Sequence, residues 1–316
     1  PDPPMKHLLT LDDWSPDDIA ASVKLAADIK ARPAAYADAM SRKVLFMVFE
    51  KPSLRTRVSF ETGMARMGGY AINYDTSTSP LGAGKESLED TIRVVSRYAD
   101  LIVARLYKHT DLDKMAANSS VPVINGLTDL AHPCQILADL LTITEKKGGL
   151  QGRTLCYLGD SNNNVTHSLM YGCAMTGMHI RIGCPDAPAY LPQPAVTART
   201  RELAAATGAT LGVFADACEA ARGADVVYTD SWMSYHIPPA ELVDRVAALK
   251  PFQVTNTVMS HARPDAVFMN CLPAARGYEQ TAEVIDGPQS IVFDQAENRL
   301  YAQNAVMLQL LRAAGR

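Results

Sequence analysis

The sequence predicts an α/β protein with two doubly wound parallel-sheet domains, and two observations support this. Short runs of apolar and β-branched residues alternate with helical stretches along the whole chain, a pattern typical of parallel strands joined by helices. The chain has 316 residues, about twice the usual length of one domain. We therefore expect two sheets, each covered by helices on both faces.

The predicted strands are ten short apolar runs. They lie at 44–49, 71–74, 101–104, 121–124, 154–158, 179–183, 210–213, 226–228, 266–269 and 291–293. Amphipathic stretches between them predict helices that include 58–67, 88–98, 135–145, 165–176, 196–206 and 296–311. A polar, glycine-rich segment at 145–153 interrupts the alternation at mid-chain, which predicts a domain border there.

Composition excludes several classes of protein. Lys plus Arg number 30 against 34 for Asp plus Glu, a net charge of −4, whereas a general nucleic-acid binder usually carries a basic excess. No run approaches the roughly 20 apolar residues of a membrane helix, and no secretory signal is visible at the start of the chain. The six cysteines form no Cys-x-x-Cys pair, so we expect free thiols and a cytoplasmic setting. The seven histidines are scattered, so we expect no metal site.

A candidate anion site follows the first predicted strand. The segment Ser-Leu-Arg-Thr-Arg at 53–57 opens the next helix. In open α/β sheets ligands collect at the carboxyl ends of strands, and unpaired N–H groups at a helix N-terminus attract anions. The hydroxyls of Ser53 and Thr56 and the forked guanidinium groups of Arg55 and Arg57 suit phosphate oxygens. The alternative is a capping serine followed by solvated arginines.

Two further candidate residues lie at or after the carboxyl ends of predicted strands. Arg105 ends the strand predicted at 101–104, and His132 opens a helix after the strand predicted at 121–124. A single histidine is more often structural than catalytic, so His132 alone establishes no function.

Taken together, the motifs resemble the aspartate/ornithine carbamoyltransferase superfamily, in its ornithine branch. They occur in one order along nearly the whole chain: Ser-Leu-Arg-Thr-Arg at 53–57, Arg105, His-Pro-Cys-Gln at 132–135, Gly-Asp-Ser-Asn-Asn-Asn-Val at 159–165, Thr-Asp-Ser-Trp at 229–232, Asn-Cys-Leu-Pro at 270–273 and Glu-Asn-Arg-Leu at 297–300. Any one of them alone would be a weak signal.

The resemblance implies how the chain is divided and assembled. Residues 1–147, with a C-terminal helix at 296–316 that packs back on them, are expected to bind carbamoyl phosphate. Residues 148–295 are expected to bind the acceptor amine, which is ornithine in this branch. Members of the family form trimers with active sites at subunit interfaces, so we expect a homotrimer that carries shared sites and takes part in arginine metabolism.

The resemblance also implies roles for single residues. Ser53, Arg55, Thr56 and Arg57 would hold the phosphate, while Arg105, His132, Gln135 and Arg299 would surround the carbamoyl group. Attack by the amine builds negative charge on the carbonyl oxygen, and fixed donors such as Arg105, Thr56 and His132 would stabilise that charge. The catalytic residues are then Arg105, His132, Cys271 and Arg299. We expect no metal or other cofactor.

The acceptor site is expected in the second half of the chain. Asp230 would pair with the α-ammonium, and Asn163 and Asn164 would donate to the α-carboxylate. Cys271 would lie beside the reacting amine, with Ser234, Tyr235 and Leu272 completing the site. The alternatives are a turn aspartate, asparagines that only open a helix, and a buried apolar cysteine.

The chain departs from the ornithine-branch pattern at three places. That branch usually has Ser-Met-Gly where this chain has Ser-Tyr-His at 234–236, and His where this chain has Asn270. The loop at 79–85, in the region that reaches a neighbouring subunit in the family, matches neither branch. These departures leave putrescine, lysine or an N-acylated ornithine as alternative acceptors. A carbamoyl phosphate-binding regulator without turnover is the alternative of another class.

Overall fold

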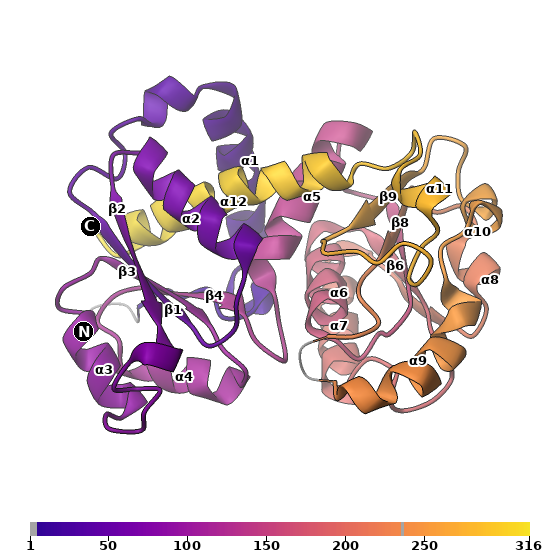
Figure 1. The fold of residues 1–316 in the computed structure, drawn as a ribbon. Coiled ribbons are helices and arrows are strands. Elements are labelled where there is room, and N and C mark those ends of the chain that lie inside the picture. The colour runs from indigo at the N-terminus through magenta and orange to yellow at the C-terminus, as the bar shows by residue number, and fades with distance from the viewer. Residues whose placement is uncertain (1–4, 235–236) are drawn as a thin grey trace. The chain divides into compact units, whose positions relative to one another are not determined.

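The computed structural model describes residues 5–234 and 237–316, shown as a ribbon in Figure 1. The chain forms two compact units: unit 1 holds the chain up to Leu141 together with Glu297–Arg316, and unit 2 holds Thr142–Ala296. Each unit is built around one fully parallel sheet, so the predicted fold class is confirmed.

The sheet of unit 1 has four strands in the order β2-β1-β3-β4. They are β1 (Val44–Phe49), β2 (Tyr70–Asp75), β3 (Leu101–Arg105) and β4 (Val123–Leu127). Because β2 and β3 lie on opposite sides of β1, the strand order reverses between β1 and β3. Phe49 is paired with Arg105, so the loops after these two strands leave the sheet together. Such a switch point is where open α/β sheets bind ligands.

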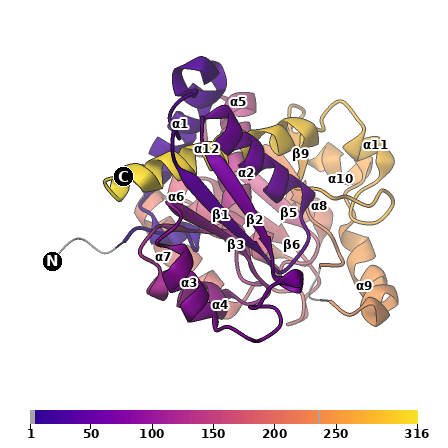
Figure 2. The same ribbon diagram turned by 60° about the vertical axis from the view of Figure 1, so that its left-hand side comes forward.

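Helices cover both faces of this sheet (Figure 2). One face carries α3 (Leu88–Val95) and α4 (His109–Asn118), whose apolar side chains join Phe46, Val48 and Ile102 in a buried cluster. The other face carries α1 (Pro16–Ala31), α2 (Leu54–Arg66) and the unit 1 part of α12 (Val292–Ala313). α5 (Pro133–Lys147) begins in unit 1, just after β4.

The sheet of unit 2 has five strands in the order β7-β6-β5-β8-β9. They are β5 (Thr154–Leu158), β6 (His179–Gly183), β7 (Leu211–Phe214), β8 (Val226–Thr229) and β9 (Val267–Asn270). The order reverses between β5 and β8, and Leu158 is paired with Thr229 at their carboxyl ends. The predicted acceptor residues follow β5, β8 and β9.

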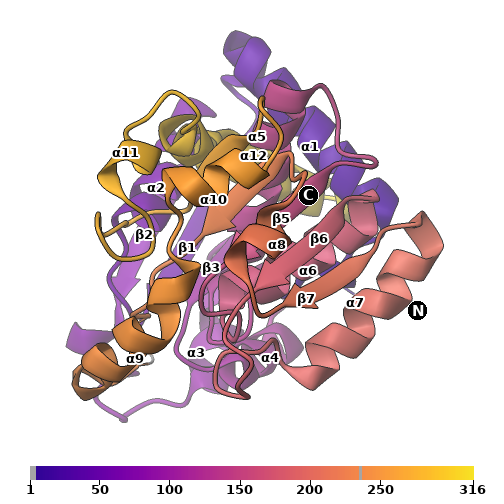
Figure 3. The same ribbon diagram turned by 90° about the vertical axis from the view of Figure 1, so that its right-hand side faces the viewer.

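Two groups of helices cover this second sheet (Figure 3). One face carries α6 (Asn164–Thr176) and α7 (Pro194–Thr207), and the other carries α8 (Ala217–Ala221), α10 (Asn256–His261) and α11 (Ala282–Ile285). α9 (Leu242–Leu249) follows β8. Short 3₁₀ turns complete the chain at Leu11–Asp13, Pro33–Tyr36, Thr76–Thr78, Pro239–Glu241 and Lys250–Phe252. No helix in the described part of the chain is long and apolar enough to cross a membrane.

Two sequence-based expectations about these elements were wrong. The run 291–293 was expected to be a strand, but Val292 and Phe293 form the first turn of α12. Ser290, just before this run, forms a single β-bridge with Phe268. The helix predicted at 296–311 begins earlier, at Val292, and so includes most of the apolar run. The second helix begins at Leu54 and not at 58 because the Ser53 side chain caps it.

Candidate active site

Ser53 and Thr56 lie where α2 begins, at the carboxyl edge of the unit 1 sheet. Ser53 is the N-cap, and its hydroxyl accepts the backbone N–H of Thr56 at 3.2 Å. Thr56 is buried and Arg55 is half-buried. The capping role and an anion site are compatible, because the other N–H groups of the first turn still point out of the helix end.

The hydroxyl of Thr56 joins two arginines that are far apart in the sequence. Its oxygen accepts Arg299 Nη2 at 3.1 Å and Arg105 Nη1 at 3.5 Å. Arg299 also donates to Gln135 Oε1 at 2.8 Å and to Gln303 Oε1 at 2.8 Å. The structure therefore brings four of the predicted carbamoyl phosphate ligands, from α2, β3, α5 and α12, into one cluster, which we call the Thr56 cluster (Thr56, Arg105, Gln135 and Arg299).

His132 lies against this cluster, directly before α5. Its side chain is buried, and burial together with the positive charges of Arg299, Arg105 and Arg55 holds the pKa of the imidazole well below its ordinary value. The ring is therefore neutral at pH 7 and keeps one N–H that it can donate. The three arginine charges that contribute to this lowering also favour an anionic ligand.

Arg57 is placed differently from the other predicted ligands. Its Nε lies 3.0 Å from Glu61 Oε1, one turn along the same helix, and about half of its side chain is exposed. The structure does not bring Arg57 into the Thr56 cluster.

Lys51 is a residue near this site that sequence reasoning missed. Its side chain is buried, with the ammonium group 4.5 Å from the centroid of the Tyr107 ring. Burial and the nearby Arg105 lower its pKa to about 8. A lysine beside a proline in a loop suggests a solvated charge. Its place between β1 and Ser53, at the carboxyl edge of the sheet, is the signal that could have identified it.

Asp230 and Cys271 come together in unit 2. They follow β8 and β9, whose last residues Thr229 and Asn270 are paired. The thiol of Cys271 donates to Asp230 Oδ1 at 3.1 Å, and the same oxygen accepts the backbone N–H of Ser231 at 2.7 Å. The thiol of Cys271 therefore has a carboxylate partner, which argues against the alternative of a cysteine that only fills an apolar core.

Asn163 is the N-cap of α6, and hydrogen bonds engage its whole amide. The oxygen accepts from Thr166, while the amide nitrogen donates to Tyr157 Oη at 2.9 Å and to the carbonyl of Asp160 at 2.6 Å. Both amide protons are used in this way, so Asn163 holds the loop after β5. Asn164 follows it as the first residue of the helix.

The remaining predicted acceptor residues are only partly described. Ser234 is half-buried, and its carbonyl accepts Ile237 N at 3.1 Å. Leu272 has a positive φ of 60°, a conformation that non-glycine residues rarely adopt. Tyr235 lies outside the described residues.

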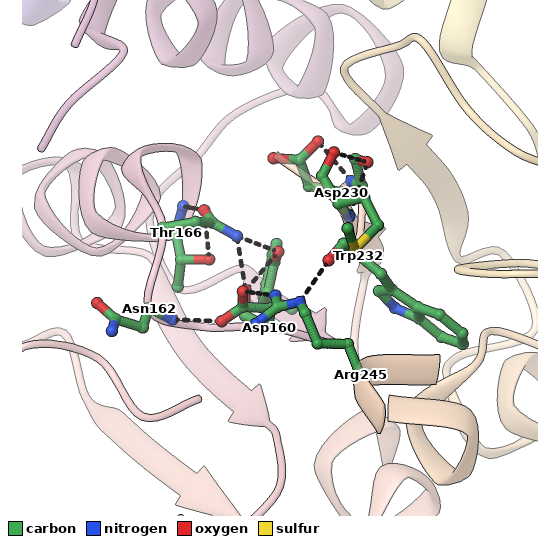
Figure 4. Close-up of polar contacts among 10 residues, drawn as sticks. Asp160, Asn162, Thr166, Asp230, Trp232 and Arg245 are labelled. Atoms are coloured by element: carbon green, nitrogen blue, oxygen red, sulfur yellow. Dashed lines mark hydrogen bonds and ion pairs between the residues drawn. The ribbon is translucent and has the colours of Figure 1, made fainter. Parts of the chain in front are cut away.

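A buried ion pair that the sequence did not reveal joins two of the acceptor loops. Arg245 of α9 is paired with the carboxylate of Asp160 and donates Nε to the carbonyl of Trp232 at 2.9 Å (Figure 4). Asp160 belongs to the loop after β5 and Trp232 to the loop after β8. The pair spans 85 residues of sequence, so no local pattern could have predicted it.

Glu279 is a buried carboxyl group in the same unit. It lines a cavity of about 130 Å³ together with Ser231, Trp232, Met233, Leu242, Ala275 and Tyr278. Its Oε1 accepts the backbone N–H of Ala275 at 2.9 Å. Burial, reinforced by the charge of Asp230, raises the pKa of this carboxyl group to about 7. Among the described residues, no group of three or more His, Cys, Asp or Glu side chains could hold a metal ion.

Glu279→Gln is expected to remove a pH-dependent loss of stability. The pKa of Glu279 is about 7 in the folded chain against 4.5 ordinarily, so the stability that the protonated carboxyl group contributes is complete below pH 4.5 and is lost as the pH rises to 7. A difference of this size corresponds to about 3 kcal/mol. Urea unfolding of the variant and the parent chain from pH 4.5 to pH 8 measures it.

The stability of Glu279→Gln relative to the parent should therefore grow over this pH range and then level off. Glu283→Gln, an exposed carboxyl group nearby, is the matched control and should show no such trend. A constant difference between Glu279→Gln and the parent across the range would contradict the assignment.

Comparison with known proteins finds relatives over nearly the whole chain. Residues 6–145 match the family described as "Aspartate/ornithine carbamoyltransferase, carbamoyl-P binding domain", and residues 151–310 match "Aspartate/ornithine carbamoyltransferase, Asp/Orn binding domain". An ornithine carbamoyltransferase of Clavibacter sepedonicus is 47% identical over 97% of this chain and 99% of its own length. One of Methanothermobacter thermautotrophicus is 48% identical over 96% and 98%.

Solved structures agree with these relatives. The ornithine carbamoyltransferase of Pyrococcus furiosus superimposes with a TM-score of 0.91 at 43% identity, over 96% of both chains. The ornithine transcarbamoylase of Giardia lamblia gives a TM-score of 0.90 at 42% identity, over 97% of this chain and 98% of its own. The chain therefore belongs to the aspartate/ornithine carbamoyltransferase family.

Proposed function

We propose that the chain transfers the carbamoyl group of carbamoyl phosphate to the side-chain amine of L-ornithine, giving L-citrulline and phosphate. The observation that carries this proposal is the Thr56 cluster with His132 beside it, at the switch point of the unit 1 sheet. The relatives named as ornithine carbamoyltransferases support ornithine as the acceptor.

The phosphate is held at the start of α2. Ser53, Arg55 and Thr56 supply hydroxyl, guanidinium and backbone N–H donors there, and a helix N-terminus favours the dianion. Arg57, which is paired with Glu61 at the surface, reaches the phosphate by exchanging that exposed ion pair for the ligand. Exposed pairs of this kind contribute about 1 kcal/mol or less, so the exchange costs little.

The carbamoyl group is polarised by the buried donors of unit 1. Arg105, Thr56 and the neutral His132 donate to the carbonyl oxygen as negative charge develops on it, while Gln135 and Arg299 orient the group. These donors are fixed before the reaction, so they stabilise the charge without reorganising. The leaving phosphate keeps its contacts with the arginines and takes the proton that the attacking amine loses.

The acceptor is bound by unit 2. Asp230 pairs with the α-ammonium of ornithine, and Asn164 donates to the α-carboxylate, with Asn163 holding the loop in place. Cys271 lies beside the reacting amine, and Ser234, Tyr235 and Leu272 complete the site. The contact between Cys271 and Asp230 supports these roles. It places a carboxylate and a thiol side by side, where they could contact the two amino groups of one ornithine molecule.

We further propose that the chain works in the cytoplasm, in arginine metabolism. The free thiols of all its cysteines support a reducing compartment.

The direct test measures phosphate release from carbamoyl phosphate with ornithine, lysine, putrescine, N-acetylornithine and aspartate. We expect turnover with ornithine and formation of citrulline. N-Acetylornithine should be a poor acceptor because it lacks the α-ammonium that Asp230 would bind. Rapid turnover of another amine in place of ornithine would contradict the proposed acceptor, and binding of carbamoyl phosphate without turnover of any amine would favour a regulator.

We also propose a homotrimer. Four exposed apolar side chains on α2 and the edge strand β2 support self-association: Leu54, Val58, Tyr70 and Ile72, which are 73%, 48%, 68% and 41% exposed. Exposed apolar groups on adjacent elements are typical of protein interfaces. Leu54 directly follows Ser53, so such an interface would lie next to the phosphate-binding segment.

Light scattering of the native chain should give the mass of three copies, about three times 34.2 kDa. Tyr70→Asp should weaken this assembly and lower activity with it, because a buried unpaired charge opposes association. Tyr98→Asp, at a tyrosine that follows α3 and is 77% exposed, is the control. A fully active monomer would overturn the proposal.

A further inference from the structure

Asn270, which departs from the family's usual histidine, stands directly before Cys271. It belongs to a group of four buried polar side chains that carry no charge: Tyr228, Asn270, Gln280 and Gln295, each 0% exposed. We call this group the amide network. All four lie in unit 2.

Hydrogen bonds connect the amide network from β8 to the loop after β9. Gln295 donates Nε2 to Tyr228 Oη at 3.0 Å and accepts the backbone N–H of Asn270 on Oε1 at 3.0 Å. Asn270 donates Nδ2 to Gln280 Oε1 at 2.9 Å, and Gln280 donates onward to the carbonyl of Ala275 at 3.1 Å.

The network brackets Cys271 on both sides in the sequence. The backbone N–H of Asn270 is held by Gln295, and that of Leu272 is held by the side-chain oxygen of Asn270 at 2.8 Å. The second bond forms an Asx turn, which supports the uncommon positive φ of Leu272. The main chain at Cys271 is therefore fixed by buried side chains and not only by the strand that precedes it.

The same network reaches the strand that carries the partner of Cys271. Tyr228 lies two residues before Asp230, and its hydroxyl is the far end of the Gln295 bridge. Gln295 thus connects the end of β8 with the end of β9, next to the point where Cys271 Sγ and Asp230 Oδ1 lie 3.1 Å apart. Figure 4 shows Asp230 in the same close-up as the paired side chains of Asp160 and Arg245.

The side chains of the amide network carry no charge, so they can hold the loop after β9 without adding an ion next to Asp230. Hydrogen-bonded amides and a phenol in the interior rigidify a site without adding a buried charge. A cation in their place would compete with the substrate ammonium for Asp230.

We propose that Asn270, Gln280 and Gln295 are positioning residues for carbamoyl transfer, which set the contact between Cys271 and Asp230 and through it the placement of the acceptor amine. The kinetic consequences rest on the proposed function. The geometric consequence, a defined environment for the Cys271 thiol, does not.

The test replaces Gln295 in two ways. Gln295→Met keeps the volume of the side chain but removes both hydrogen bonds. Gln295→Glu, which full burial keeps protonated and uncharged, keeps an oxygen that accepts Asn270 N–H and donates its O–H to the Tyr228 hydroxyl oxygen. For Gln295→Met we expect kcat to fall about tenfold to 100-fold because a misplaced reactant costs that much, with KM for carbamoyl phosphate unchanged. Gln295→Glu should recover most of the lost kcat.

A second readout is the rate at which iodoacetamide alkylates Cys271, followed by mass spectrometry of its peptide. Gln295→Met should raise this rate several-fold by loosening the contact with Asp230, and Gln295→Glu should leave it near that of the parent chain. Gln289→Met is the matched control. It removes an amide contact with Ala266 at the opposite end of β9 and should alter neither kcat nor alkylation.

Gln280→Met provides an independent variant if Gln295→Met does not fold, and it should show the same pattern. Unchanged alkylation and kcat in a folded Gln295→Met or Gln280→Met chain would overturn the inference. Equal losses in Gln295→Met and Gln295→Glu would also overturn it. If the parent chain does not carbamoylate ornithine, the proposed function fails while the alkylation rates still decide the inference.

Discussion

The acceptance of two guanidinium groups by the hydroxyl of Thr56 is the interaction on which the candidate site depends. Arg105 ends β3, Arg299 lies on α12, and Thr56 lies in the first turn of α2. Two buried like charges repel each other strongly unless neutral acceptors hold them in place. Gln135 and Gln303 accept from Arg299, the carbonyl of Gly126 accepts from Arg105 at 3.3 Å, and Thr56 accepts from both, so neutral acceptors hold both cations at one end of the sheet.

Burial, reinforced by this concentration of positive charge, sets the ionisation of neighbouring groups. His132 stays neutral and can donate a hydrogen bond, and the pKa of Lys51 is lowered to about 8. Unit 2 has the opposite character, with Asp230 bonded to Cys271 and with Glu279 raised to a pKa of about 7 by burial and by Asp230. One unit therefore suits an anionic carbamoyl donor, and the other suits a cationic amino acid.

Much of this arrangement could be predicted from the sequence because it depends on local patterns. Parallel strands end in the same direction, so residues such as Arg105 and Asp230, which directly follow or end apolar runs, had to lie at the carboxyl edges of the sheets.

The ion pair of Asp160 with Arg245 and the bridge from Gln295 to Asn270 could not be predicted, since they join distant segments through side-chain geometry. The ion pair of Arg57 with Glu61 was not predicted. The motif around Arg57 indicates only a phosphate ligand or a solvated charge at the start of the helix. The strand expected at 291–293 failed because three apolar residues do not distinguish a strand from the first turn of a helix.

The most direct test of the account is the affinity of the chain for carbamoyl phosphate when Thr56 is replaced by valine. This change keeps the shape of the side chain and removes the oxygen that both arginines share. Hydrogen bonds to charged groups contribute about 1.5–3 kcal/mol, so titration calorimetry without amine should show binding weakened about tenfold to 100-fold. Thr91→Val replaces a buried threonine of α3 whose hydroxyl donates to the carbonyl of Ser87 at 2.9 Å, and this variant should bind as the parent chain does. Unchanged affinity in Thr56→Val would contradict the central claim that the Thr56 cluster is the carbamoyl phosphate site.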